Sequence, residues 1–361
     1  MRLLKSDTVK VLAVTLALFG ILEALVRVTG LGATPADVAA GQFTTEDVHG
    51  EDWRDYLIVG REQSTSAVYR PFVEYTSGPV DGQFVNVTDQ GLRCNVNGST
   101  DCAVRGGRDE IWVFGGSTTF GYGVKNDETI PAYMDQMTPG YRVLNFGVAS
   151  YYSTIERILF LNLLTQYDPP AAVVFIDGLN DFYYNEVPDV SGFSDELANT
   201  FELPDSARTL SRLTAALRQS RLITLVLNAF APEVERASVL LRDDAALARV
   251  ITRLEANMAV RSAAAERLGI QIVNVLQPVP LYGPGHSTSL VKADVLNLGE
   301  HVNSGRGYEL IHENADLLAD PTLLNLAEFG SEGQMYVDTV HYHPDFNNMI
   351  AERILSRLDL S

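Results

Sequence analysis

The chain has 361 residues, 46% of them hydrophobic, which is enough to build a sizeable core in one large domain or two. Its formal net charge of −19 at pH 7 repels phosphate backbones and leaves no basic footprint for nucleic acid. A globular protein that does not bind nucleic acid is therefore expected.

An uncharged apolar run follows a basic N-terminus. Arg2, Lys5 and Lys10 precede residues 11–22, VLAVTLALFGIL, a pattern typical of a targeting segment. The helical pattern continues through residue 26 without a small-residue cleavage site, so we expect residues 1–30 to be an N-terminal transmembrane helix that stays on the protein as a membrane anchor. Residues 11–26 span about 24 Å as a helix, somewhat less than a bilayer core of about 30 Å. A buried core helix is the alternative.

Residues 31–108 are expected to form a linker followed by an edge hairpin. Polar clusters up to residue 67 indicate a segment of irregular structure that covers the domain. The alternating apolar and polar runs of residues 68–93 favour a hairpin packed on the edge of a sheet. Cys94 and Cys102 are the only cysteines, and a short hairpin closed by a disulfide fits the polar segment between them in an oxidising compartment. Two unpaired thiols are the alternative.

Short apolar runs alternate with helical patterns from residue 109 onward. Strands are predicted at residues 110–114, 141–146, 171–177 and 270–276, and helices at 129–137, 153–167 and 243–268. We expect Ser153 and Glu156 to form a capping box at the second helix. Strands that alternate with helices predict a parallel central sheet.

Ser117 is a candidate nucleophile. It follows a strand buried on both faces and a Gly115-Gly116 turn, so it lies where open α/β sheets bind ligands, outside the carboxyl ends of the strands. A serine needs a base and oxyanion donors. Later segments offer these groups: residues 143–150 with Gly147, the sequence GLND with Asn180, and DTVH with Asp338 and His341.

In this order, the motifs resemble the SGNH hydrolases, or GDSL-type esterases and lipases, over roughly residues 109–358. The resemblance implies a three-layer α/β/α sandwich with a flavodoxin-like parallel sheet, and Ser117 as nucleophile. It also implies an oxyanion hole formed by the Ser117 and Gly147 amides and the Asn180 side chain, with His341 as base and Asp338 as its orienting carboxylate. Gly116 replaces the aspartate of the plain Gly-Asp-Ser motif, so this is a Gly-Gly-Ser variant.

Other residues near these motifs have alternative interpretations. Asp338, His341 and His343 could ligate a metal, but that reading leaves Ser117 and Asn180 unexplained, so no metal or cofactor is predicted. We interpret His343 as a residue at a helix start and Asp181 as a structural partner of the Asn180 loop. Isolated loop histidines without chemistry are expected at residues 286, 301 and 312.

Residues 183–242 interrupt the strand and helix alternation and are interpreted as a helical insertion in a hydrolase domain of residues 109–361. A cap over the site and a packed side helix explain it equally well. The later pattern predicts a short helix around residues 317–329 and a closing helix after Pro344.

Together these features predict a carboxylic ester hydrolase that acts outside the cytoplasm, in the periplasm or extracellularly, and is held at the membrane by its N-terminal helix. Its expected partner is an acyl or O-acetyl ester of a glycan or lipid. Two alternatives stay open: a non-catalytic, membrane-tethered binding or structural subunit with the same fold, and a polysaccharide O-acetyltransferase, which uses a sugar hydroxyl in place of water.

Overall fold

The structure is a computed structural model, and it describes residues 6–29, 45–64, 67–183, 242–283 and 298–360. The chain divides into two compact units, residues 1–42 with 190–238, and residues 43–189 with 239–361. In the first unit the described residues form helix α1, Ser6–Thr29. The predicted insertion of residues 183–242 lies almost wholly outside the described residues.

Helix α1 does not support the predicted membrane anchor. Within the described ranges, no helix is both long and apolar enough to cross a membrane. Lys10 and Glu23 lie inside α1, so its uncharged stretch covers residues 11–22 alone.

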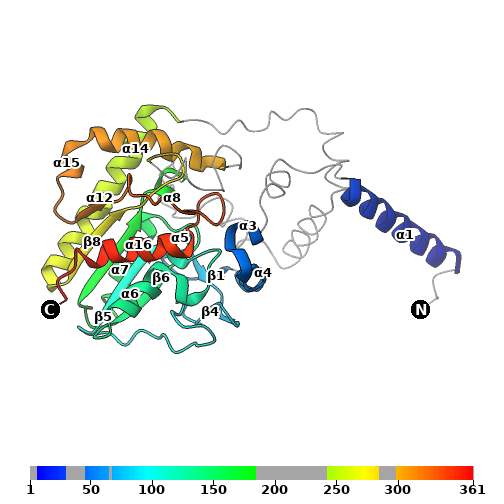
Figure 1. Ribbon diagram of the computed structural model, residues 1–361, viewed down its shortest axis with the longest axis horizontal. Helices are drawn as coiled ribbons and strands as arrows, with labels where there is room; N and C mark the ends of the chain where they lie inside the picture. The colour runs from blue at the N-terminus through cyan, green and yellow to red at the C-terminus, as the bar shows by residue number, and fades with distance from the viewer. Residues whose placement is uncertain (1–5, 30–44, 65–66, 184–241, 284–297, 361) are drawn as a thin grey trace. The chain divides into compact units, whose positions relative to one another are not determined.

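A five-stranded parallel sheet organises the second unit (Figure 1). Its strands are β5 (Glu110–Gly115), β6 (Arg142–Gly147), β7 (Ala172–Asp177), β8 (Gln271–Leu276) and β9 (Leu323–Asn325). The order β6-β5-β7-β8-β9 is the flavodoxin-like arrangement 2-1-3-4-5. Gly115 pairs with Gly147 on one side and with Ile176 on the other, so these three strands end at the same level. The predicted parallel α/β sheet is confirmed.

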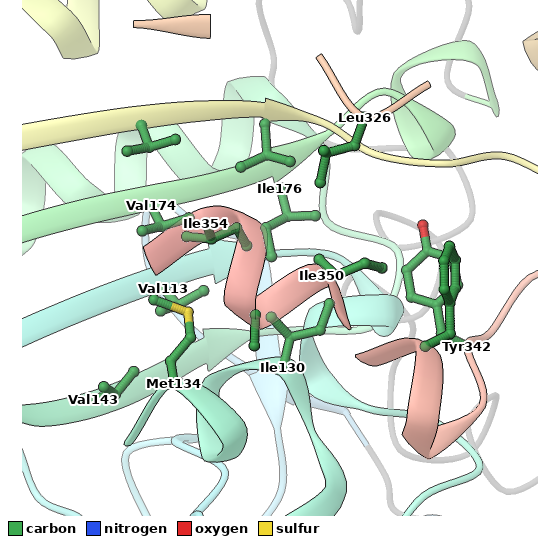
Figure 2. Packing of buried hydrophobic residues seen from close by; sticks show 14 of the residues in the cluster. Val113, Ile130, Met134, Val143, Val174, Ile176, Leu326, Tyr342, Ile350 and Ile354 are labelled. Atoms are coloured by element: carbon green, nitrogen blue, oxygen red, sulfur yellow. The ribbon is translucent and has the colours of Figure 1, made fainter. Parts of the chain in front are cut away.

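Helices cover both faces of the sheet, because alternate strand residues point to opposite sides. Ile111 and Val113 pack with α6 (Ile130–Met137) and α16 (Pro344–Leu355), as Figure 2 shows for the labelled side chains. Trp112 and Phe114 face the other cluster, with α7 (Ser153–Leu163) and α12 (Asp244–Leu268). The second unit is therefore a three-layer α/β/α structure.

Shorter elements surround this core. The helices are α3 (Thr45–His49), α4 (Trp53–Glu62), α5 (Ser117–Phe120), α8 (Leu179–Tyr183), α14 (Asn303–Glu313) and α15 (Ala315–Leu318), with 3-10 turns at Gly50–Asp52, Asn126–Glu128 and Gly299–Val302. The N-terminal strands are β1 (Ala67–Tyr69), β2 (Tyr75–Ser77), β3 (Val80–Asp81) and β4 (Asn86–Val87).

The N-terminal strands form two antiparallel hairpins, β1–β2 and β3–β4. Arg93 bridges β4 to β6 by pairing with Val87 and Asn145, which attaches this region to the β6 edge. The Cys94–Cys102 disulfide is also confirmed, with the two Cα atoms 5.4 Å apart. The chain between these cysteines is a loop rather than a hairpin.

Two local predictions were wrong. Helix α7 begins at Ser153 after an N-cap at Tyr152 that makes no side-chain cap, because the Ser153 hydroxyl donates instead to Asp181 at 2.5 Å. The short helix predicted around residues 317–329 ends at Leu318, and the fifth strand, β9, follows it. Only three residues long, β9 has too little periodicity to be recognised from sequence.

Candidate active site

The candidate nucleophile turn follows β5 directly. Gly115 and Gly116 connect the strand to α5, whose first residue is Ser117. A β-carbon at Gly115 would lie 2.0 Å from Thr119 Oγ1, and one at Gly116 would lie 2.3 Å from Asn180 Nδ2. Both glycines are therefore closely packed, and a side chain at residue 116 would displace the end of the Asn180 side chain.

Ser117 lies where the sheet order reverses, between β5 and β7, which is the point at which such sheets bind ligands. Its side chain is half-buried. As the first residue of α5, its N–H has no acceptor within the helix. This amide is thus available for an oxyanion.

The Asn180 side chain lies beside this turn. Asn180 belongs to α8, directly after β7, and its Nδ2 donates to the Tyr151 carbonyl at 2.7 Å. The contact with Gly116 places the amide next to the residue that precedes Ser117. An amide nitrogen carries two hydrogens, so a second one is left for a ligand.

Gly147 lies close to the turn, but its amide is already engaged. Its N–H donates to Asn145 Oδ1 at 2.9 Å, and a β-carbon here would lie 2.3 Å from the Phe120 nitrogen. Gly147 was predicted as an oxyanion donor, but its N–H is engaged, and the residue lets β6 approach α5 closely. Ser150, three residues later, is exposed and has φ 65°, and no hydrogen bond from its N–H is found among the described residues. Sequence reasoning missed it because a serine in the left-handed region resembles any loop residue.

Asp338 and His341 are joined as expected for an orienting carboxylate and its base. His341 Nδ1 lies 2.6 Å from Asp338 Oδ2, and Oδ1 accepts the Val340 and His341 amides at 2.9 Å each. Desolvation raises the pKa of Asp338, but the His341 ring and these hydrogen bonds outweigh it and hold the pKa below its ordinary value. His341 is 15% exposed, and its Nε2 is buried without a partner in the described part of the chain.

Tyr122 connects the serine turn to the histidine. Its N–H donates to the Ser117 carbonyl at 3.1 Å, and its ring stacks on the His341 ring with centroids 5.3 Å apart. Gly123 adds a second contact, since a β-carbon there would lie 2.5 Å from Val337 Cγ2 in the segment before Asp338. The loops that carry Ser117 and His341 therefore lie against each other.

A second histidine belongs to this region, against the expectation of an isolated loop residue. Burial and then the charge of His341 lower the pKa of His301 to about 4, and Asp338 opposes this effect. Its ring lies 4.7 Å from that of Tyr183, centroid to centroid. His301 is thus a neutral imidazole near the Asp338–His341 pair. Its neighbours come from residues far away in the chain, so no local pattern could reveal it.

Two side chains from outside the predicted hydrolase segment hold the loop after α5. Buried Arg93 donates to the carbonyls of Phe120 and Val124, at 2.8 and 2.6 Å. Gln63 Nε2 donates to the Gly121 carbonyl at 2.8 Å, and its Oε1 accepts the Gly123 N–H at the same distance. The loop that carries Tyr122 is therefore fixed at both its carbonyls and its amides.

Asp181 fixes the Asn180 loop through hydrogen bonds to neighbouring elements. It accepts the Ser153 hydroxyl at 2.5 Å and the Gly178 N–H at 3.4 Å, and Arg253 Nη2 donates to its backbone carbonyl at 2.9 Å. Burial and the neighbouring Asp177 raise the pKa of Asp181. Its contacts are those of a structural partner of Asn180.

His343 does not face the other residues of the proposed metal alternative. It caps α16, with Nδ1 accepting the Asp345 N–H at 3.3 Å, and its ring lies 6.0 Å from that of His49. Within the described residues, no group of three histidine, cysteine, aspartate or glutamate side chains could hold a metal ion.

No family model and no curated protein matches the sequence. The solved structures to which this chain is similar include the acetyl xylan esterase AlAXEase, 13% identical over 69% of this chain and 100% of that chain, with a TM-score of 0.35. A carbohydrate acetylesterase family member from Sinorhizobium meliloti is 15% identical over 69% and 97%, with a TM-score of 0.34. A member of the lipolytic protein G-D-S-L family from Veillonella parvula DSM 2008 is 14% identical over 68% and 96%, with a TM-score of 0.36.

Proposed function

We propose that this protein is a serine ester hydrolase that cleaves an acyl or O-acetyl ester of a glycan or lipid. One observation carries the proposal: Tyr122 binds the Ser117 carbonyl with its amide and stacks on His341 with its ring. A serine at the sheet's ligand-binding edge and a histidine oriented by a carboxylate thus occupy neighbouring loops. These are the groups that covalent acyl transfer requires.

In the proposed reaction, His341 Nε2 takes the proton of Ser117 as the serine oxygen attacks the ester carbonyl. Asp338 holds the imidazole in orientation and stabilises its protonated form. The Ser117 amide and the free Asn180 N–H meet the oxyanion, and the Ser150 amide replaces that of Gly147 as third donor. The leaving alcohol receives the proton from His341, and a water then cleaves the acyl-serine by the same route.

No hydrogen bond joins Ser117 Oγ to His341 Nε2 in the described structure. The proposed reaction requires this hydrogen bond to form in the complex with substrate, as catalytic hydrogen bonds often do. The buried Nε2 without a partner is the atom that the reaction needs.

The proposed reaction takes place outside the cytoplasm. The Cys94–Cys102 disulfide supports this location, because such bonds persist in oxidising compartments. The N-terminal sequence is basic and then apolar, which is the pattern of a segment that directs export.

The test uses a fluorophosphonate probe and short nitrophenyl esters. We expect the full chain to be labelled and to hydrolyse the esters, and Ser117→Ala to abolish both. His341→Gln should reduce labelling strongly without unfolding the protein. Thr138→Ala is a control at a hydroxyl that bonds only within α6.

A non-catalytic binding subunit is the second candidate, favoured by the engaged Gly147 amide and by the Asn180 hydrogen bond to Tyr151. In that case the two groups that were expected to donate to an oxyanion have a structural role instead. Labelling that does not depend on Ser117, together with no ester hydrolysis by folded protein, would select this candidate.

A further inference from the structure

A cavity of about 390 Å³ lies beside the end of β6, away from the Ser117 turn. Its walls come from the β1–β2 hairpin, the loop before Arg93, β6 and α7. The apolar side chains among them include Val73, Leu92, Phe146, Val148, Leu159 and Leu163. The volume lies within the range of small-molecule sites, about 300–1,000 Å³, and the mainly apolar lining is typical of them.

One charged side chain lines the cavity. Arg70 is the single ionised side chain among the described lining residues, and no aspartate or glutamate joins it. One guanidinium nitrogen, Nη2, donates to the Asp89 carbonyl. The Nε atom is buried and has no hydrogen-bond partner in the described part of the chain. A buried donor without an acceptor is costly, and a charged donor more so. The guanidinium of Arg70 is therefore only partly satisfied by the described protein groups.

Tyr151 forms the wall between this cavity and the candidate active site. Its hydroxyl donates to the Val73 carbonyl at 3.0 Å, on the cavity side. Its own carbonyl accepts Asn180 Nδ2 at 2.7 Å, on the side of the serine turn. Burial raises the pKa of Tyr151 well above its ordinary value, Glu74 adds to this and Arg70 opposes it, so both charges act on the same wall.

We propose that this cavity binds an aliphatic carboxylate, with its hydrocarbon chain along the apolar wall and its carboxylate on the Arg70 guanidinium. The hydrocarbon chain contacts the apolar lining, and the carboxylate pairs with the one charged side chain of that lining in a charge-assisted hydrogen bond. The site is separate from Ser117 and does not rest on the proposed esterase function.

The test is calorimetric titration of the full chain carrying Ser117→Ala with hexanoate, octanoate and decanoate. We expect one saturable site whose affinity rises about fourfold per added methylene until the cavity is filled. Decanol, which has the same chain without the charge, should bind at least tenfold more weakly than decanoate. Because Ser117 is absent, a failure of the esterase proposal leaves this result unchanged.

Two variants locate the site. Arg70→Gln should weaken decanoate at least tenfold and leave decanol unchanged. Asn162→Trp should exclude both ligands by filling the cavity, since Asn162 lines it from α7 and no hydrogen bond of its side chain is found in the described residues. Arg105→Gln is the matched control, because Arg105 is 62% exposed and outside the cavity, and it should bind normally.

Three results would overturn the proposal. The first is the absence of saturable binding by the folded protein. The second is equal affinity for decanol and decanoate, which would indicate a neutral apolar site. The third is normal decanoate binding by folded Asn162→Trp, which would place the ligand elsewhere.

Discussion

Replacing Gly116 by alanine tests the candidate site through a single added methyl group. The new β-carbon would lie 2.3 Å from Asn180 Nδ2 and 3.0 Å from the Tyr151 carbonyl oxygen. The Gly116 backbone has φ −81°, which alanine adopts freely, so the conflict is steric rather than conformational. The movable atom is the end of the Asn180 side chain. We expect it to leave its position and lose its bond to Tyr151.

The structure predicts unequal effects on stability and activity. Losing the Asn180 hydrogen bond costs about 1 kcal/mol, and alanine recovers about 0.4–1 kcal/mol by restricting the unfolded chain. With the tight Tyr151 contact added, the free energy of unfolding should fall by no more than about 2 kcal/mol. Displacing one oxyanion donor lowers kcat by about 100- to 1,000-fold.

The assay pairs nitrophenyl ester hydrolysis with urea unfolding for three variants. Asn180→Ala gives the effect of complete donor loss, which Gly116→Ala should approach. Gly140→Ala is the matched control, since a β-carbon there meets nothing within 4 Å, and its kcat should equal that of the wild type. If folded Gly116→Ala retains kcat within threefold, the Asn180 amide takes no part in the reaction and our placement of the oxyanion site is refuted.

Three further predictions concern other parts of the second unit. Tyr122→Leu should lower kcat up to about tenfold, because it removes the ring stacked on His341. Tyr122→Phe keeps the ring, so its kcat should be near that of the wild type. An equal loss of kcat in both variants would contradict stacking as the cause. Burial, with Asp177 nearby, raises the pKa of Glu156 well above 4.5, so the folded state binds its proton more tightly than the unfolded state. The free energy of unfolding of the wild type should therefore fall as pH rises from 4.5 through the folded-state pKa, and folded Glu156→Gln should lack that part of the fall. Urea unfolding at pH 5 and pH 8 measures both proteins. An equal change in unfolding free energy between the two pH values for both proteins would refute this prediction. Replacing Cys94 and Cys102 by alanine opens a loop with a sequence separation of 8, which should cost about 2.6 kcal/mol in urea unfolding under oxidising conditions and nothing in reductant.

The sequence was informative where local pattern and tertiary role agree. The Ile-Trp-Val-Phe run of β5 predicted a strand buried on both faces, and all six of its residues are buried. Asp243 and Gly269 predicted the two ends of α12. The Asp243 side chain caps the N-terminus by accepting the Ala246 N–H, and Gly269 ends the helix with a left-handed φ of 64°. These signals act within a few residues, so no knowledge of the fold was needed to interpret them.

Prediction failed where the fold gives a polar group another partner than the one that the sequence pattern suggested. Ser153 and Glu156 have the spacing of a capping box, but Asp181 accepts the serine hydroxyl and Glu156 is buried at 1% exposure. Gly147 looked like an oxyanion donor until Asn145, two residues earlier, took its N–H. In each case a buried polar group had to be satisfied, and the partner became known only from the fold.

The side chains that hold the loop after α5 affect how the chain is divided into functional regions. The carbonyls of Phe120, Gly121 and Val124 are buried acceptors, and they are satisfied by two side chains, Arg93 and Gln63, which precede the first strand of the sheet. Burial lowers the pKa of Arg93 to about 9, so it is still charged at neutral pH and acts as a strong donor. Without these two side chains the loop that positions Tyr122 against His341 would hold several unsatisfied buried groups, each costing about 1–3 kcal/mol. The region that the sequence suggested as linker and cover is therefore part of what shapes the candidate active site.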